Sequence, residues 1–188
     1  MKHTLSLDLA SASPTAIFWW KVRNLRNRLR GWKQELIAAT NLAPHAELHM
    51  AVIRANGQRV ELGRVGRRVV TNNGVAAIVD AFQNTFELEN FNWHDSGTSS
   101  TAEAVGDSVL GTAAGPARVS GTQSEPATNQ YRTVATISYT GTASIVEHGL
   151  FSASTAGVLF DRTVFTAVGV NNGDSIQFTY TLTVNAGG

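Results

Sequence analysis

The last predicted strand, residues 175 to 184, constrains the fold of this chain more than any other segment. Apolar side chains stand at every second position from Ile176 to Val184, and serine, glutamine or threonine fill the positions between them. Successive side chains of a β-strand point to opposite faces, so this alternation predicts a strand with one buried and one hydroxyl-rich face. The end of the chain therefore favours an antiparallel sheet with one face on a core.

The same character extends through the chain from Asn84, which is rich in Thr, Ser, Gly, Val and aromatic residues. Further strands are expected in apolar runs bounded by small polar turns. These runs are Leu88 to His94, Arg118 to Ser124, Tyr131 to Thr140, Ser144 to Ser152 and Val158 to Phe165, with a turn at Asn172-Gly173-Asp174. About seven strands with short turns predict a mainly β fold, an antiparallel β-sandwich or jelly-roll-like domain over residues 46–188.

A hairpin is expected at the start of this domain. The runs Glu47 to Arg54 and Gln58 to Val65 flank Ala55-Asn56-Gly57, and Asn-Gly tolerates the positive φ angles of a tight turn. One short covering helix is expected over Val75 to Gln83, with Thr71 or Asn72 as its cap. Its apolar face is predicted to contain Val75, Ile78, Val79 and Phe82.

Residues 1–45 differ from the rest and are predicted to form a basic amphipathic helical arm. Ser13 suits an N-cap and Pro14 the first helical position. Apolar residues then recur at helical spacing as far as Ile37, and lysines and arginines occupy much of the remaining surface. This helix is expected to end near Asn41, before Pro44.

Charge is divided unequally along the chain. Residues 1 to 68 hold 12 of the 15 Lys and Arg but only 4 Asp and Glu, whereas residues 69 to 188 hold 3 basic and 10 acidic residues. Such an asymmetry favours an assembly partner or a polyanion on the basic side. The chain has no cysteine, and neither a secretory signal nor a membrane span is predicted, so we expect a soluble protein made in a cytoplasm.

The sequence predicts no catalytic, cofactor-binding or metal-binding residues. Three sequential pairs could suggest catalysis: His94-Asp95, Glu147-His148 and Asp161-Arg162. Neighbours on a strand point to opposite faces, so none of these pairs can act as a base with its own orienting partner. We interpret them as turn or surface residues. Five scattered histidines without cysteine give no zinc-ligand spacing, and the glycine-rich stretches lack a phosphate-loop lysine.

The arm carries the candidate partner-binding residues, in which aromatic anchors accompany arginines. They are Phe18, Trp19, Trp20, Arg23, Arg26, Arg28, Arg30 and Trp32. This combination also suits a membrane interface or a nucleic acid. We favour packing of the aromatic stripe on a neighbouring subunit, with the arginines directed at acidic surface, because the rest of the same chain is acidic.

Several short sequence segments between Arg67 and the C-terminus resemble segments of small virion structural proteins of tailed bacteriophages. The longer segments are Arg68 to Val75, His94 to Thr98, Gln130 to Ala135, Glu147 to Ser152, Leu159 to Phe165 and Gly173 to Tyr180. The shorter segments are Thr101 to Ala104 and Ser120 to Gln123. The resemblance implies a non-enzymatic component of a virion, labelled variously as head decoration, tail or fibre, and implies no catalytic residues.

The favoured hypothesis is a capsid decoration, or cement, protein that clamps neighbouring capsid subunits and attaches through its N-terminal arm. Its expected partners are the major capsid protein or other virion subunits, and further copies of itself in a symmetric oligomer such as a trimer. The alternative is a tail, baseplate or short-fibre component that binds a host glycan through Trp93, Phe91 or Tyr131. Core packing is the competing role for those three aromatic residues.

Overall fold

The computed structural model describes residues 45–67 and 69–185. Apart from Asn185, these residues belong to one compact unit. The helix predicted between Pro14 and Asn41 lies outside the described residues, so the helical arm remains a prediction.

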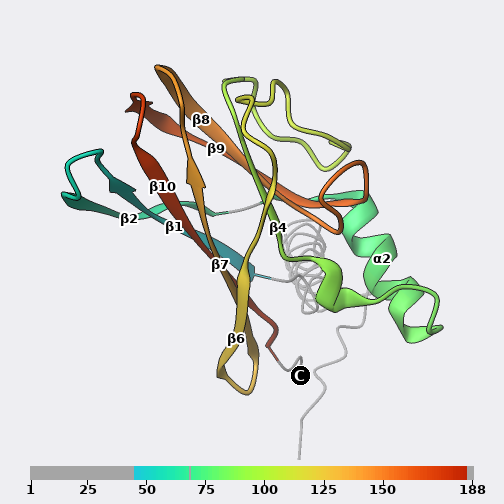
Figure 1. Ribbon diagram of the computed structural model, residues 1–188. Helices are drawn as coiled ribbons and strands as arrows, with labels where there is room; N and C mark the ends of the chain where they lie inside the picture. Colours follow the sequence, from blue (N-terminus) through green and yellow to red (C-terminus); the bar gives the residue numbers. More distant parts are fainter. Residues whose placement is uncertain (1–44, 68, 186–188) are drawn as a thin grey trace, which may run out of the picture. The chain divides into compact units, whose positions relative to one another are not determined.

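In the described residues, ten strands form two antiparallel five-stranded sheets (Figure 1). The first sheet has the order β2 (Arg59–Arg67), β1 (His45–Ile53), β10 (Ser175–Thr183), β7 (Gln130–Ser138) and β6 (Thr122–Ala127). The second has the order β3 (Val69–Val70), β9 (Leu159–Val170), β8 (Ala143–Phe151), β4 (Trp93–Gly97) and β5 (Val119–Ser120). The mainly β, sandwich-like fold predicted from the sequence is confirmed.

The core lies between the two sheets. Leu48, Ile176 and Phe178 of the first sheet pack in one cluster with Ile145 and Val170 of the second, and all five are fully buried. The predicted alternation in β10 is confirmed, since Ile176, Phe178 and Tyr180 face inward. Burial of such large side chains stabilises the sandwich by roughly 1.5–3 kcal/mol for each one.

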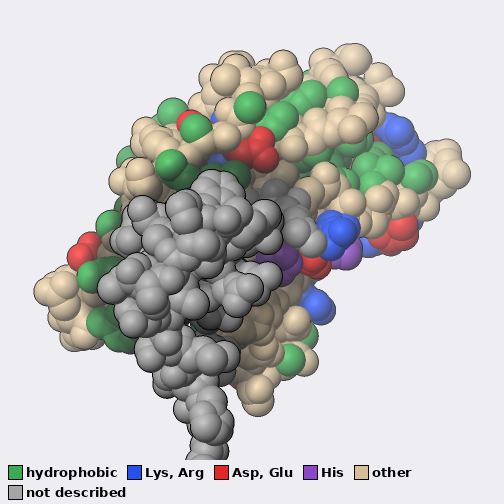
Figure 2. Space-filling model, turned by 180° about the vertical axis from the view of Figure 1, so that it is seen from behind, with side chains coloured by type: hydrophobic (Ala, Val, Ile, Leu, Met, Phe, Trp, Pro, Cys, Tyr) green, Lys and Arg blue, Asp and Glu red, His purple; other side chains and the backbone are tan. Residues whose placement is uncertain are grey.

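The predicted hairpin is also confirmed, with strands slightly longer than expected. β1 and β2 pair around a turn in which the Gly57 amide donates to the Arg54 carbonyl and Gly57 has φ +84°. Most of its charged side chains find partners in the same hairpin. Arg64 Nη1 donates to Glu47 Oε1 at 2.7 Å, and Arg59 pairs with Glu61. Figure 2 shows basic, acidic and histidine side chains close together on that side of the molecule.

The short helix α2 (Asn72–Phe82) forms where it was predicted, but its buried face is different. Thr71 is the N-cap and accepts a 3.0 Å hydrogen bond from the Gly74 amide. The buried residues are Gly74 and Ala77, because the helix lies directly on the backbone of β9. A Cβ atom on Gly74 would lie only 2.4 Å from the Phe160 carbonyl oxygen. Of the predicted apolar face, Val75, Val79 and Phe82 are exposed.

Two local predictions were wrong. The run Leu88 to His94 is not one strand: it contains a short 3-10 helix, η1 (Leu88–Asn90), and only its last residues enter β4. The weak strand expected from Arg118 to Ser124 is divided into β5 and β6, which belong to different sheets. Pro126 lies in edge strand β6 at a register irregularity, where its missing N–H is tolerated.

Candidate functional site

The three residue pairs interpreted above as turn or surface residues are in fact buried strand residues. His94 and Asp95 lie in β4, Glu147 and His148 in β8, and Asp161 and Arg162 in β9, and none is more than 8% exposed. The surface interpretation was wrong because β8 and the adjoining parts of its neighbours are covered on both faces. One face meets the core, and the long loop between β4 and β5 covers the other.

Glu147 anchors that loop. Its carboxylate accepts backbone hydrogen bonds from the amides of Ser99, Gly111 and Thr112, at 2.9–3.1 Å. It also accepts a 2.7 Å hydrogen bond from Arg162 Nε. A buried carboxylate that receives four such donors is satisfied where it lies. Its function in this arrangement is to hold the two ends of the loop together.

Arg162 extends the same network into the middle of the loop. Its Nη1 atom donates to Asp107 at 2.9 Å, and its Nη2 atom donates to the Thr101 carbonyl at 3.0 Å. Burial lowers the pKa of Arg162, but the hydrogen bonds to Glu147 and Asp107 outweigh that effect and keep the pKa above its ordinary value. The guanidinium therefore stays charged and clamps the loop.

Buried polar contacts also connect the two sheets. His94 Nδ1 lies 3.0 Å from His148 Nε2, and His94 Nε2 lies 3.2 Å from Thr133 Oγ1 in β7. The Tyr139 hydroxyl, which follows β7, donates to Ser96 Oγ in β4 at 2.9 Å. Burial raises the pKa of Tyr139 to about 12, so this phenol remains a donor at physiological pH. These contacts hold the two sheets in a fixed position relative to each other.

Neither a metal centre nor a spanning helix is found in the part of the chain that the structure describes. No group of three or more His, Cys, Asp or Glu side chains there has the arrangement of a metal site. No helix in that part is both long and apolar enough to cross a membrane.

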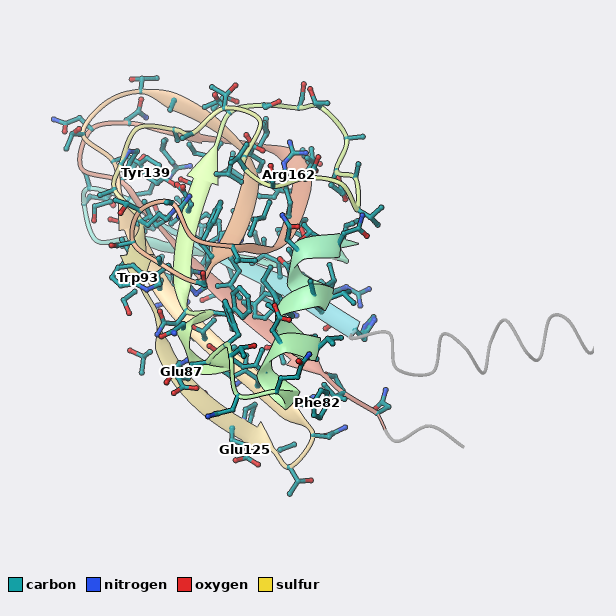
Figure 3. The ribbon with its side chains drawn as sticks, turned by 90° about the vertical axis from the view of Figure 1, so that its right-hand side faces the viewer. Phe82, Glu87, Trp93, Glu125, Tyr139 and Arg162 are labelled. Carbon is teal, nitrogen blue, oxygen red and sulfur yellow. The ribbon has the colours of Figure 1, made fainter. Side chains whose placement is uncertain are left out.

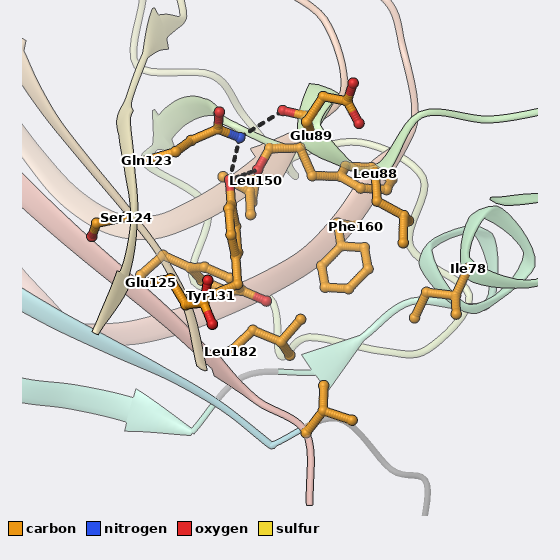
Figure 4. A pocket seen from close by; sticks show the side chains of 13 residues that line it. Ile78, Leu88, Glu89, Gln123, Ser124, Glu125, Tyr131, Leu150, Phe160 and Leu182 are labelled. Carbon is orange, nitrogen blue, oxygen red and sulfur yellow. Dashed lines mark hydrogen bonds between the residues drawn. The ribbon is translucent and has the colours of Figure 1, made fainter. Parts of the chain in front are cut away.

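An apolar groove at one end of the sandwich is the best candidate for a binding site. It lies between the two sheets, beside α2 and η1, and has a volume of about 540 Å³. Its walls are mainly aromatic and aliphatic: Ile78, Leu88, Phe91, Tyr131, Leu150, Phe160, Tyr180, Leu182 and Val184 (Figure 4). The rings of Phe91 and Phe160 are 4.7 Å apart, and Phe160 meets Tyr180 edge to face.

The polar groups on one side of the groove are already paired with each other. Gln123 Nε2 donates to the Glu89 carbonyl at 2.7 Å and to the Tyr131 hydroxyl at 2.8 Å (Figure 4). The Tyr131 hydroxyl in turn donates to the Phe91 carbonyl at 2.9 Å. Burial raises the pKa of Tyr131, so it stays protonated. The groove is therefore suited to apolar side chains, and Glu89 and Glu125 are the acidic residues in its lining.

The residues predicted for partner binding, Phe18, Trp19, Trp20, Arg23, Arg26, Arg28, Arg30 and Trp32, lie outside the described residues. Of the aromatics considered for glycan binding, Phe91 is only 3% exposed and belongs to the core. Tyr131 is half-buried in the groove wall, and half-buried Trp93 packs near Leu110 and Phe151. These three residues do not form an open aromatic platform.

Sequence reasoning missed the groove. Its one available signal was the final alternation, in which Leu182 and Val184 continue the inward-facing series beyond Tyr180. In the structure Leu182 and Val184 line the groove, and Val184 is 48% exposed. The pattern predicted the face correctly but not that the sandwich is open at this end.

Comparisons of the chain with protein-family models, curated protein sequences and solved structures found no match.

Proposed function

We propose that this chain is a non-enzymatic bacteriophage virion structural protein, and specifically a capsid decoration protein that clamps neighbouring capsid subunits. The observation that carries the proposal is the resemblance of several segments between Arg67 and the C-terminus to small tailed-phage virion proteins. It implies a structural role and a location in the virion. The N-terminal arm would serve as the attachment element.

Several of those segments contain residues that determine the local structure of this chain. The segment from Arg68 to Val75 supplies the N-cap Thr71 and the close contact at Gly74. The segment from Glu147 to Ser152 supplies the carboxylate that anchors the long loop, and the segment from Leu159 to Phe165 supplies its arginine partner. The resemblance therefore includes residues with structural roles in this fold.

The physical character of the described unit suits a particle component. The β-sandwich is held by packing and buried hydrogen bonds, and the chain contains no cysteine, so its stability does not depend on a disulfide. A protein that binds only the assembled shell stabilises that shell by mass action, since its binding free energy is added to the assembled state alone. Many weak identical contacts on a symmetric lattice then act together.

Copy number tests the proposal against its alternative. Quantitative mass spectrometry of purified particles would compare the abundance of this chain with that of the major capsid protein. A decoration protein is expected at a stoichiometry of the same order as the capsid subunit. An abundance far below that would contradict decoration and favour a tail, baseplate or short-fibre component.

A further inference from the structure

The groove leaves large apolar side chains open at the surface. Leu88 and Val184, at its margin, are 42% and 48% exposed, whereas Phe91 and Phe160 behind them are buried. A concave surface lined mainly by apolar and aromatic side chains is the usual form of a binding site. The hydrogen bonds among Gln123, Tyr131 and Phe91 fix the shape of one wall before any ligand arrives.

Acidic residues lie at the same end of the sandwich as this apolar surface. Glu89 and Glu125 line the groove, and Figure 3 shows Glu87 and Glu125 at the same end of the sandwich as Phe82 at the end of α2. The described residues as a whole hold 7 Lys and Arg against 12 Asp and Glu. A partner for this site would therefore combine large apolar groups with positive charge.

Residues 14–41 of the chain have this chemistry. They include Trp20 and Trp32 among apolar residues at helical spacing, together with six of the seven Lys and Arg of residues 1–44, which contain only two acidic residues. A helix of that length would be about 42 Å long at 1.5 Å per residue. Aromatic anchors in an apolar groove with a charged rim are a common mode of helix recognition.

We propose that the groove binds residues 14–41 of a neighbouring copy of the chain. The inference rests on the self-assembly included in the proposed function and identifies its contact surface. Matching surfaces on two different parts of one chain make a head-to-tail contact, which closes into a ring when the rotation between copies permits.

The position at which the chain enters the sandwich fits such a ring. His45 pairs with Thr183 at the start of β1, next to Leu182 and Val184 in the groove wall. The residues that follow the arm and the groove that receives an arm thus lie at the same end of the unit. A rotation axis near that end brings the arm of each copy within reach of the next groove.

Cysteine cross-linking of the full chain tests this proposal without background, because the natural chain contains no cysteine. Two separately purified full-length variants, Asn24→Cys carrying an affinity tag and Ser124→Cys without one, would be mixed and oxidised. Ser124 is exposed in the groove-lining strand β6, so its substitution should leave the fold intact, which circular dichroism would check. A matched control is Thr140→Cys, which is exposed beyond the other end of β7.

The proposal predicts a disulfide between the tagged and untagged chains at Ser124→Cys, with a yield at least about tenfold above that at Thr140→Cys, which corresponds to about 1.4 kcal/mol of preference. Equal yields at the two positions, or no disulfide at either, would overturn the groove as the receptor. In a chain carrying both Asn24→Cys and Ser124→Cys, a disulfide formed only within one chain would overturn the exchange between copies. The assay uses no particles, so it can fail while the virion location holds.

Discussion

Arg162 Nε donates a 2.7 Å hydrogen bond to the Glu147 carboxylate in a fully buried position between neighbouring strands β8 and β9. Glu147 also accepts hydrogen bonds from three amides of the loop between β4 and β5, and Arg162 also donates to Asp107 in that loop. One buried ionic centre therefore holds the loop. Removal of Glu147 leaves the buried Arg162 guanidinium with Asp107 as its one carboxylate partner, and removal of Arg162 leaves the Glu147 carboxylate buried with backbone amide donors alone.

We therefore expect Glu147→Gln to lower the free energy of unfolding by about 1–3 kcal/mol, because the buried guanidinium loses one of its two carboxylate partners and the loop amides lose an acceptor oxygen. Urea denaturation would measure the change, and limited proteolysis should show faster cleavage within residues 98–117. Glu125→Gln, at an exposed position in β6, is the matched control and should change stability by less than about 0.5 kcal/mol. A cost below about 1 kcal/mol for Glu147→Gln would contradict the anchoring role.

Gly74→Ala tests the close contact between α2 and β9. In an unconstrained helix this substitution would stabilise by about 1 kcal/mol, since glycine is a poor helix former. Here the new methyl group would lie 2.4 Å from the Phe160 carbonyl, so we expect a loss of about 1–3 kcal/mol instead. Gly106→Ala, where nothing lies within 4 Å of the added carbon, is the control. Thermal unfolding that showed Gly74→Ala to be stabilising would mean that the helix does not lie this close to the strand.

Asp174 should make stability depend on pH in the acid range. Hydrogen bonds from the Asn171 amide, the Arg54 side chain and the Ala55 amide lower its pKa below the ordinary value. Its contribution is therefore complete above the unfolded-state pKa of about 3.9 and is lost as the pH falls through the lower folded-state pKa. The difference in Tm between the natural chain and Asp174→Asn should be full at neutral pH and narrow below about pH 4. A difference that does not change with pH would show that the charge of Asp174 is unimportant; Asp80→Asn, at an exposed position, serves as the control.

Charge reversal in the arm tests its electrostatic role. We expect Arg26, Arg28 and Arg30 replaced together by Glu to weaken attachment to particles by about tenfold or more, since each exposed ion pair contributes up to about 1 kcal/mol. Replacement of the same three residues by Lys keeps the charge and should leave attachment nearly unchanged. Pull-down of the variants with particles lacking the natural protein would measure occupancy, and equal occupancy for the Glu and Lys variants would remove the electrostatic part of the proposal.

Local patterns predicted the strands and the hairpin well, because alternation in β10 and Asn56-Gly57 between β1 and β2 reflect physics that acts within a few residues. They failed where distant segments decide the outcome. Glu147 and Arg162 looked like surface residues because charged residues are rarely buried, and only the covering loop supplies the hydrogen bonds that permit it.

The covering helix shows the same limit. Val75, Val79 and Phe82 form the more hydrophobic face of α2, yet Gly74 and Ala77 are the residues that the fold buries. Close approach to the β9 backbone requires small side chains, and this requirement depends on the position of β9, which no local pattern reveals. The groove was missed for a related reason, since its walls come from strands that are far apart in the sequence.

Immunogold labelling of intact particles with an antibody against the β-sandwich, viewed by electron microscopy, tests the central claim most directly. The proposed decoration role predicts dense label over the head. Label confined to the tail or its tip would contradict decoration and point to an adhesion or baseplate module. Particles that carry no label and contain none of this chain by mass spectrometry would contradict the virion role altogether.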